Sequence, residues 1–349
     1  MRCFVVVALT LGAGLLRADA PRGASGDTSA VRQALKQVID RPAVALSPTT
    51  RPMPDRDGLL VTHLVITAEP GQTVPALILE SRPVTKKPAV ILLHGTGGHK
   101  EDNLPLATTL AKRGFVAVVL DGRYHGERCR DGKGSVDYFA AISQAYADGK
   151  SHPWLFDTVY DVTRMIDYLQ TRDDVDANRI GLMGISKGGM ECYLTAAYDD
   201  RVAVAVPCIS AQSFAWGLTN DAWHKRVGTV QGAFDQAAKY DGVDTPDAAF
   251  VKKFYDRLLP GIDGILDGPS VIPTIRPRPL LTINGETDGI NPLPGVKLVH
   301  AATAAAYEQA GVGDHFVGEI EIGTRHDVTA EYRSKAVEWF VRWLKPAGN

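Results

Sequence analysis

The sequence predicts an α/β fold, a doubly wound and mostly parallel sheet with an N-terminal antiparallel hairpin. Two observations carry this prediction. Short apolar or strongly β-prone runs recur along the chain, and segments of helical periodicity separate most of them. Strands that are apolar throughout are typical of parallel sheets covered by helices on both faces, and their alternation with helices gives the doubly wound order. The 349 residues suffice for one large domain or two small ones.

The first twenty residues have the pattern of a secretory signal peptide. Met1-Arg2 is positively charged, residues 3–16 form an apolar run of about fourteen residues, and Ala18-Asp19-Ala20 offers a cleavage site. The apolar run is too short for a membrane-spanning helix. The alternative to a signal peptide is a buried N-terminal helix. We expect residues 1–20 to be removed and the mature protein, without a membrane span, to be exported to the periplasm or secreted.

The segment before the expected sheet, residues 21–58, divides into a helix and a linker. Apolar residues at helical spacing predict a helix over 28–40, and proline and arginine over 41–58 predict an extended connection. Two β-prone runs follow at 59–67 and 74–80. A turn signal separates them, and this order predicts an antiparallel hairpin.

We expect one domain over residues 59–346, with an insertion at about 209–275. Because the insertion interrupts the strand-helix alternation with helix-like pieces, we expect a lid above the carboxyl edge of the sheet. The six further strands are expected at 89–93, 116–120, 180–183, 203–208, 279–283 and 317–322. The helices between and after them are expected at 103–113, 156–171, 188–198, 293–309 and 331–344.

The net charge and the cysteine content exclude several classes of function. A formal net charge of −2 gives no footprint for nucleic acid or for an acidic membrane surface. Cys129, Cys192 and Cys208 remain after the signal segment, and their spacing matches no metal site. We expect no metal, and no organic cofactor is expected either. Cys192 and Cys208 are expected to be buried small residues. Whether two of the three cysteines form a disulfide stays open, as does the oligomeric state.

Residues 184–188 have the pattern of a nucleophile elbow. They read Gly-Ile-Ser-Lys-Gly between a β-prone run and a helical one. A serine on such a strand-to-helix turn projects its hydroxyl from the edge of the sheet, and the glycines avoid Cβ clashes across the turn. Ser186 is therefore the candidate nucleophile; the alternative is a Gly/Ser turn without chemical consequence.

A serine hydroxyl needs an adjacent base and a group that orients the base. His326 follows the last expected strand, whereas His315 precedes that strand and His300 lies within a helix. Asp288 follows the preceding strand, with Glu286 as the rival acid. The order serine, aspartate, histidine at three carboxyl ends predicts a catalytic triad of Ser186, Asp288 and His326. Each residue also has a non-catalytic interpretation: His326 could be a polar residue in a helix-capping loop, and Asp288 an ordinary turn residue.

An oxyanion hole needs two backbone N–H groups that face the reacting carbonyl. We expect the first from Lys187 and the second from Thr96, then Gly97, in the glycine-rich loop after the first central strand. The rival interpretation, a phosphate-binding loop, lacks the lysine-serine/threonine ending and the complete G-x-G-x-x-G fingerprint. The side chain of Lys187 is expected to be solvated rather than to meet an acidic substrate.

Four side chains are candidates for substrate contact: Arg123, Tyr124, Trp216 and Trp223. Arg123 and Tyr124 follow a strand end, and the two tryptophans lie in the expected lid. The alternative for Arg123 is a structural ion pair with a carboxylate. The alternative for the two tryptophans, and for Trp154, is packing within the lid.

From about residue 59 to 344, the chain resembles the α/β-hydrolase superfamily, in particular dienelactone-hydrolase-like and acetyl-esterase-like serine hydrolases. The resemblance rests on the hairpin residues Glu69-Pro70-Gly71 and Val74-Pro75-Ala76-Leu77-Ile78-Leu79, and on the motifs His94-Gly95-Thr96-Gly97-Gly98, Asp121-Gly122-Arg123 and Gly184-Ile185-Ser186-Lys187-Gly188-Gly189. It implies a serine hydrolase with Ser186, Asp288 and His326. It departs from dienelactone hydrolases proper, whose nucleophile is cysteine, and from acetyl-xylan esterases with an Arg-Gly-Gln loop.

The predicted function is hydrolysis of carboxylic esters through an acyl-enzyme, on small-molecule or acylated carbohydrate esters. The first alternative is a serine peptidase related to the prolyl-oligopeptidase catalytic domain. The second is a non-catalytic binding protein on a hydrolase scaffold. Because function lies in the site and not in the fold, assays must separate these three.

Overall fold

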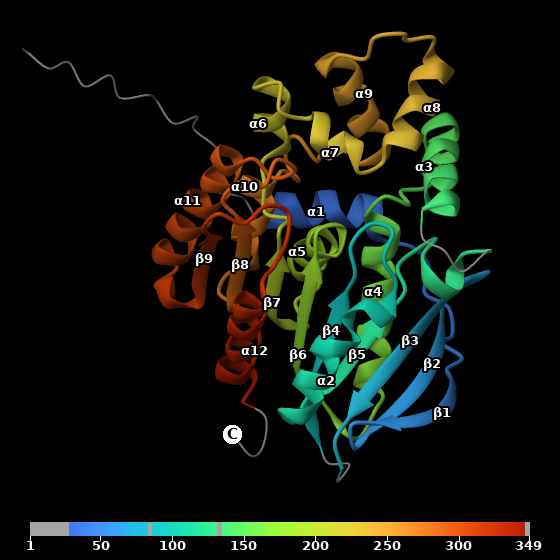
Figure 1. The fold of residues 1–349 in the computed structure, drawn as a ribbon, viewed down its shortest axis with the longest axis vertical. Helices are drawn as coiled ribbons and strands as arrows, with labels where there is room; N and C mark the ends of the chain where they lie inside the picture. The colour runs from blue at the N-terminus through green and yellow to red at the C-terminus, as the bar shows by residue number, and fades with distance from the viewer. Residues whose placement is uncertain (1–27, 83–85, 131–134, 346–349) are drawn as a thin grey trace, which may run out of the picture.

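The computed structural model describes residues 28–82, 86–130 and 135–345. Within them the chain forms a nine-stranded sheet in the order β1-β2-β3-β5-β4-β6-β7-β8-β9 (Figure 1). The predicted fold class is confirmed. The strands are β1 Thr49–Arg56, β2 Leu59–Glu69, β3 Gln72–Glu80, β4 Lys87–Leu93, β5 Val116–Leu120, β6 Val175–Ile185, β7 Val202–Cys208, β8 Leu280–Gly285 and β9 Phe316–Glu321.

The N-terminal end of the sheet is antiparallel. The predicted hairpin is present as β2 and β3, and β3 joins the central sheet by pairing antiparallel with β5. The extended connection expected over 41–58 contains a strand that was not predicted, β1, which pairs antiparallel with β2. The two prolines of this strand, Pro52 and Pro54, hid it from a propensity-based prediction. An edge strand tolerates proline because one row of its N–H groups has no ladder partner.

The central strands β4 to β9 pair in parallel, and each face of the sheet is covered by helices. Alternate residues of β4 enter different cores: Ala89 and Ile91 pack on one face, Val90 and Leu92 on the other. Helices α4 and α5 cover the first face, and α2 and α12 the second. These helices are α2 Leu104–Lys112, α4 Phe156–Gln170, α5 Lys187–Tyr198 and α12 Ala330–Leu344.

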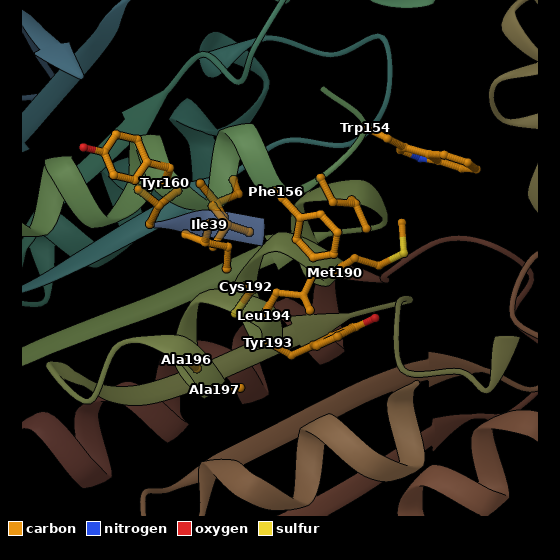
Figure 2. Close-up of a cluster of buried hydrophobic side chains, with 14 of the residues drawn as sticks. Ile39, Trp154, Phe156, Tyr160, Met190, Cys192, Tyr193, Leu194, Ala196 and Ala197 are labelled. Atoms are coloured by element: carbon orange, nitrogen blue, oxygen red, sulfur yellow. The ribbon is translucent and has the colours of Figure 1, made fainter. Parts of the chain in front are cut away.

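The helix that carries the elbow, α5, is buried along its length. Figure 2 shows side chains of α5 such as Met190 and Leu194 in one cluster with Phe156 of α4 and Ile39 of α1 (Thr28–Ile39). All four side chains are at most 1% exposed. Burial on this scale fixes α5 against its neighbours, because each such side chain contributes roughly 1.5–3 kcal/mol when removed from water. The start of α5, where the elbow lies, is fixed with it.

Residues 209–275 form a helical insertion above one end of the sheet (Figure 1). Its two longest helices enclose an aromatic core in which Phe234, Phe250 and Phe254 meet edge to face or at a tilt. A helix that was not predicted, α3 Val136–Asp148, packs against α8 and α9 and adds Tyr146 to this core. The helices of the insertion are α6 Phe214–Thr219, α7 His224–Gly228, α8 Gln231–Asp241, α9 Ala248–Leu258 and α10 Gly268–Val271.

Three expectations concern the chain as a whole. The proposed signal peptide lies outside the described residues. Within the described ranges, no helix combines the length and the apolar character that crossing a bilayer requires. Cys129, Cys192 and Cys208 are all buried, which confirms the burial expected for Cys192 and Cys208.

Candidate active site

Ser186 stands at a sharp turn between β6 and α5, with a φ of 57°. A positive φ is unfavourable for a residue with a Cβ and costs of order 1–3 kcal/mol. Gly184 and Gly188 make this turn sterically feasible: a Cβ on Gly184 would lie 2.0 Å from the Gly188 carbonyl oxygen, and one on Gly188 would lie 2.5 Å from that of Leu93. The N–H of Ser186 donates to Cys208 O at 2.9 Å, which ties the turn to β7.

Ser186, His326 and Asp288 form a continuous chain of hydrogen bonds. His326 Nε2 lies 2.8 Å from Ser186 Oγ, and His326 Nδ1 lies 2.7 Å from Asp288 Oδ2. The three residues come from the ends of β6, β9 and β8 and meet at one edge of the sheet. In this arrangement Nδ1–H donates to the carboxylate, which leaves Nε2 free to accept the serine proton.

Asp288 is 2% exposed and accepts hydrogen bonds at both oxygens. Oδ1 accepts the N–H groups of Ile290 at 2.8 Å and Asn291 at 3.2 Å, and Oδ2 accepts Asn291 Nδ2 at 2.7 Å beside His326. Burial by itself raises the pKa of Asp288, but His326, Asn291 and the Ile290 N–H outweigh burial and hold the pKa below its usual value. The carboxylate is therefore ionised and fixed in orientation.

The rival acid and the rival histidines lie in other surroundings. Glu286 Oε2 accepts the N–H of Gly323 at 2.9 Å, in a part-exposed loop contact. His300 bonds Thr282 Oγ1 at 2.8 Å from α11 (Leu293–Gln309), and His315 bonds Pro277 O at 2.6 Å. None of Glu286, His300 and His315 therefore belongs to the hydrogen-bond chain that ends at Ser186.

The glycine-rich loop after β4 lies beside the elbow, since Gly95 is close to Ser186 Cβ. The N–H of Gly97 donates to His125 Nε2 at 3.2 Å and is therefore already engaged. The N–H of Thr96 makes no hydrogen bond within the part of the chain that the structure describes. The N–H of Lys187 is in the first turn of α5, where helices leave N–H groups without intrahelical partners. Of the expected donors, Thr96 and Lys187 thus keep N–H groups available.

Two buried histidines hold the loops on which these donors lie. His94 Nε2 accepts the N–H of Gly122 at 3.0 Å, and its Nδ1 is 2.8 Å from Gly95 O. His125 repeats this pattern with Gly97 and with Arg123 O, which lies 2.6 Å from Nδ1. Both imidazoles are neutral, because burial, followed by the charge of Lys187, lowers the pKa of His94 to about 3 and of His125 to about 2.

The expectation of a solvated Lys187 was wrong. Its side chain is 1% exposed, and Nζ lies 2.6 Å from Glu191 Oε1, one helical turn further along α5. The ammonium group contacts Gly122 below the loop that follows β5. The spacing of four residues between lysine and glutamate is visible in the sequence, but the burial that gives the pair its importance comes from the loop that covers it.

Arg123 and Tyr124, two of the expected substrate contacts, make no contact with the hydrogen-bond chain of Ser186 among the described residues. The guanidinium of Arg123 pairs with Asp161 at 2.7 Å and with Glu69. Both residues line a cleft of about 540 Å³ that contains none of the three residues of the triad. The structure thus gives Arg123 the ion pair that was the alternative, and substrate contact by either residue remains a prediction.

The tryptophans of the insertion are mainly engaged in packing. Trp223 is 7% exposed and stacks on His224 with ring centroids 3.7 Å apart. The ring of Trp216 is part-buried against Gly295 at the start of α11. Trp154 is 1% exposed and meets Phe254 in the aromatic core. A role of Trp216 or Trp223 in substrate binding stays a prediction.

Sequence reasoning missed several residues around the site: His94, His125, Glu191, Asn291 and Arg226. Of these, the two histidines carried a signal, because each follows a strand end within a polar motif, and Glu191 carried one in its spacing of four residues from Lys187. Among the described residues, no group of three or more histidine, cysteine, aspartate or glutamate side chains is arranged to hold a metal ion.

Comparison with known proteins agrees with this fold. Residues 74–215 match the model of the Dienelactone hydrolase family. The protein YtaP of Bacillus subtilis (strain 168) is 25% identical over 313 residues, covering 86% of this chain and 93% of YtaP.

Two solved structures share the fold. Acetyl xylan esterase 1 from Thermoanaerobacterium sp. JW/SL YS485 superposes with a TM-score of 0.63 and 16% identity, covering 91% of this chain and 93% of that one. A glucuronoyl esterase from Solibacter usitatus gives 0.60 and 17%, covering 90% and 91%. Identities this low establish the fold alone.

The fold and the family match over residues 74–215 indicate a hydrolase of the α/β-hydrolase superfamily. The matched segment, residues 74–215, is similar to the Dienelactone hydrolase family. The predicted resemblance and the assignment to the hydrolases are thereby confirmed.

Proposed function

We propose that the protein is a serine carboxylesterase whose catalytic triad is Ser186, His326 and Asp288. The observation that carries this proposal is the unbroken hydrogen-bond chain from Asp288 Oδ2 through the imidazole to Ser186 Oγ. Ser186 is also held at a positive φ that presents its hydroxyl at the edge of the sheet. This geometry meets the requirement for an activated nucleophile, since the base touches the serine and a third group orients the base.

The proposed reaction proceeds through an acyl-enzyme. Ser186 Oγ attacks the ester carbonyl carbon while His326 Nε2 takes the hydroxyl proton, and the carbonyl oxygen becomes an oxyanion. The N–H groups of Lys187 and Thr96 hold that oxygen. The C–O bond to the alcohol then breaks, and the imidazolium gives its proton to the leaving oxygen. Water, deprotonated by His326, repeats the attack and releases the carboxylic acid.

For the substrate we propose a small acyl ester, or an acyl or methyl ester on a carbohydrate. The support is indirect: the structural neighbours include proteins named as acetyl xylan and glucuronoyl esterases. We further propose that residues 209–275 serve as the cover of the site within a catalytic domain of residues 59–346, and that the protein is exported after loss of residues 1–20.

The test is hydrolysis of p-nitrophenyl acetate, butyrate and octanoate by the wild type and by Ser186→Ala, with circular dichroism as the control for folding. We expect turnover by the wild type alone, fastest on the shortest acyl chain. A fully active, folded Ser186→Ala variant would refute the proposal. If neither protein cleaves an ester while the wild type cleaves peptide amides, the peptidase interpretation replaces it.

A further inference from the structure

Arg226 is a buried arginine in α7 of the insertion, with 3% of its surface exposed. A buried guanidinium is normally paired with a carboxylate, because an isolated charge in the interior costs several kcal/mol. Among the described residues Arg226 has no such ion pair, and its guanidinium donates instead to the neutral side-chain oxygen of Asn291. The arrangement therefore needs a reason other than a simple salt bridge.

Two side-chain amides surround the guanidinium. Arg226 Nη2 donates to Asn291 Oδ1. In the amide orientation that satisfies both of its ends, Gln212 Oε1 lies 2.8 Å from Arg226 Nε, and Gln212 Nε2 lies 3.1 Å from Ile290 O. Because an arginine only donates, each amide must turn its oxygen toward Arg226 and its NH₂ group away from it.

The NH₂ group of Asn291, on the side away from Arg226, meets the triad. Asn291 Nδ2 donates to Asp288 Oδ2 at 2.7 Å and to Ile209 O at 2.7 Å, and it lies 3.4 Å from His326 Nδ1. Asp288 Oδ2 thus accepts from Asn291 and from His326 together. If the amide were reversed, its oxygen would face the carboxylate, and two acceptors would repel each other inside the protein.

We propose that Arg226 is a positioning residue: by fixing the amide of Asn291, it orients Asp288 and through it His326. The inference rests on the proposed function, to which it adds a residue that positions the proposed triad. Its consequence is that the insertion is part of the catalytic apparatus, because α7 must be docked for the acid to be held. The ionisable groups that act on Arg226 are Asp288 and the phenols of Tyr193 and Tyr255, and the side chain of Lys225 lies close to Gly289.

The test compares Arg226→Gln, Asn291→Ala and the double variant with the wild type on p-nitrophenyl acetate over a range of pH. We expect kcat to fall by about 10- to 100-fold in each single variant, since small misplacements of catalytic groups have effects of this size. KM should change little. The acidic limb of kcat/KM should move to higher pH, because loss of the donor lets the Asp288–His326 pair hold its proton more tightly.

The double variant separates an effect through Asn291 from a general one. If Arg226 acts through Asn291, the double variant should be no slower than Asn291→Ala. The matched control is Arg278→Gln: Arg278 is also largely buried and donates mainly to carbonyl oxygens, those of Asp199, Val202 and Ala196, but lies away from the triad. This control should lose thermal stability while keeping the wild-type kcat and pH profile.

Two results would overturn the inference. One is a folded Arg226→Gln variant with the wild-type kcat and pH profile; the other is a double variant whose losses multiply. Should Arg226→Gln not fold, Arg226→Lys and Asn291→Ala carry the same comparison, with the loss expected to be smaller in the lysine variant. Activity retained by Ser186→Ala would refute the proposed function, whereas an inactive Ser186→Ala beside an unaffected Arg226→Gln would refute this inference alone.

Discussion

Two buried cations, Lys187 and Arg226, flank the proposed triad, and they differ in how their charges are balanced. Lys187 follows the nucleophile and has a buried carboxylate partner, Glu191, 2.6 Å away. Arg226 is separated from Asp288 by one amide, that of Asn291. The charge of Lys187 is neutralised locally and supports the scaffold, whereas the charge of Arg226 is directed at the acid. A buried cation beside the site thus stabilises the scaffold in the case of Lys187 and orients the catalytic acid in the case of Arg226.

The largest expected effect concerns the acid itself. Asp288→Asn should lower kcat by about four orders of magnitude, because an amide cannot hold His326 in the tautomer that leaves Nε2 free. Steady-state kinetics on p-nitrophenyl acetate measure this. Glu286→Gln is the matched control and should stay close to wild type. A larger loss in Glu286→Gln than in Asp288→Asn would move the acid to Glu286 and remove the basis of the comparison.

The next effect tests whether Lys187 is structural. Lys187→Met should lower the free energy of unfolding by about 3–5 kcal/mol, because it leaves Glu191 buried without its partner. The double variant Lys187→Met with Glu191→Leu should recover most of that loss. Urea denaturation measures both. If Lys187→Met is as stable as the wild type, the ion pair of Lys187 with Glu191 does not stabilise the fold.

The smallest effect is a pH dependence of stability from His94 and His125. Burial lowers their folded-state pKa values to about 3 and about 2, whereas an unfolded histidine titrates near 6.5. Between these values only the unfolded chain binds the extra protons, so stability falls as pH falls below about 6.5. Each histidine contributes about 1.4 kcal/mol per pH unit. Urea denaturation at pH 7, 6 and 5 should show this slope.

Replacing one of the two histidines sharpens that test. His125→Gln should remove one histidine's share of the slope, whatever its effect on stability at pH 7. An unchanged slope would mean that His125 takes up its proton in the folded protein as readily as in the unfolded chain.

Sequence reasoning reached the parts of the molecule that depend on local patterns. Short apolar runs predicted β4 to β9, because strands buried on both faces need no polar alternation. The candidate triad came from its place after three strand ends, and the geometry brings Ser186, Asp288 and His326 together. The edge strand β1 was missed because prolines are permitted there but lower strand propensity.

The remainder depends on contacts between distant segments. Arg226 lies 65 positions from Asn291 in the chain, and no local pattern indicates that they meet. Lys187 looked like a surface lysine because the loop that buries it comes from another strand. Helix α3 was missed because its burial is against the insertion, whose course the sequence did not reveal.

The most direct test of the central claim is the identity of the acylated residue. The wild type is mixed with p-nitrophenyl acetate, quenched within the first turnover and mapped by peptide mass spectrometry. The account predicts one acetyl group on the peptide that contains Ser186, and none on that peptide in Ser186→Ala. An acetyl group on another residue, with turnover unchanged in Ser186→Ala, would contradict it.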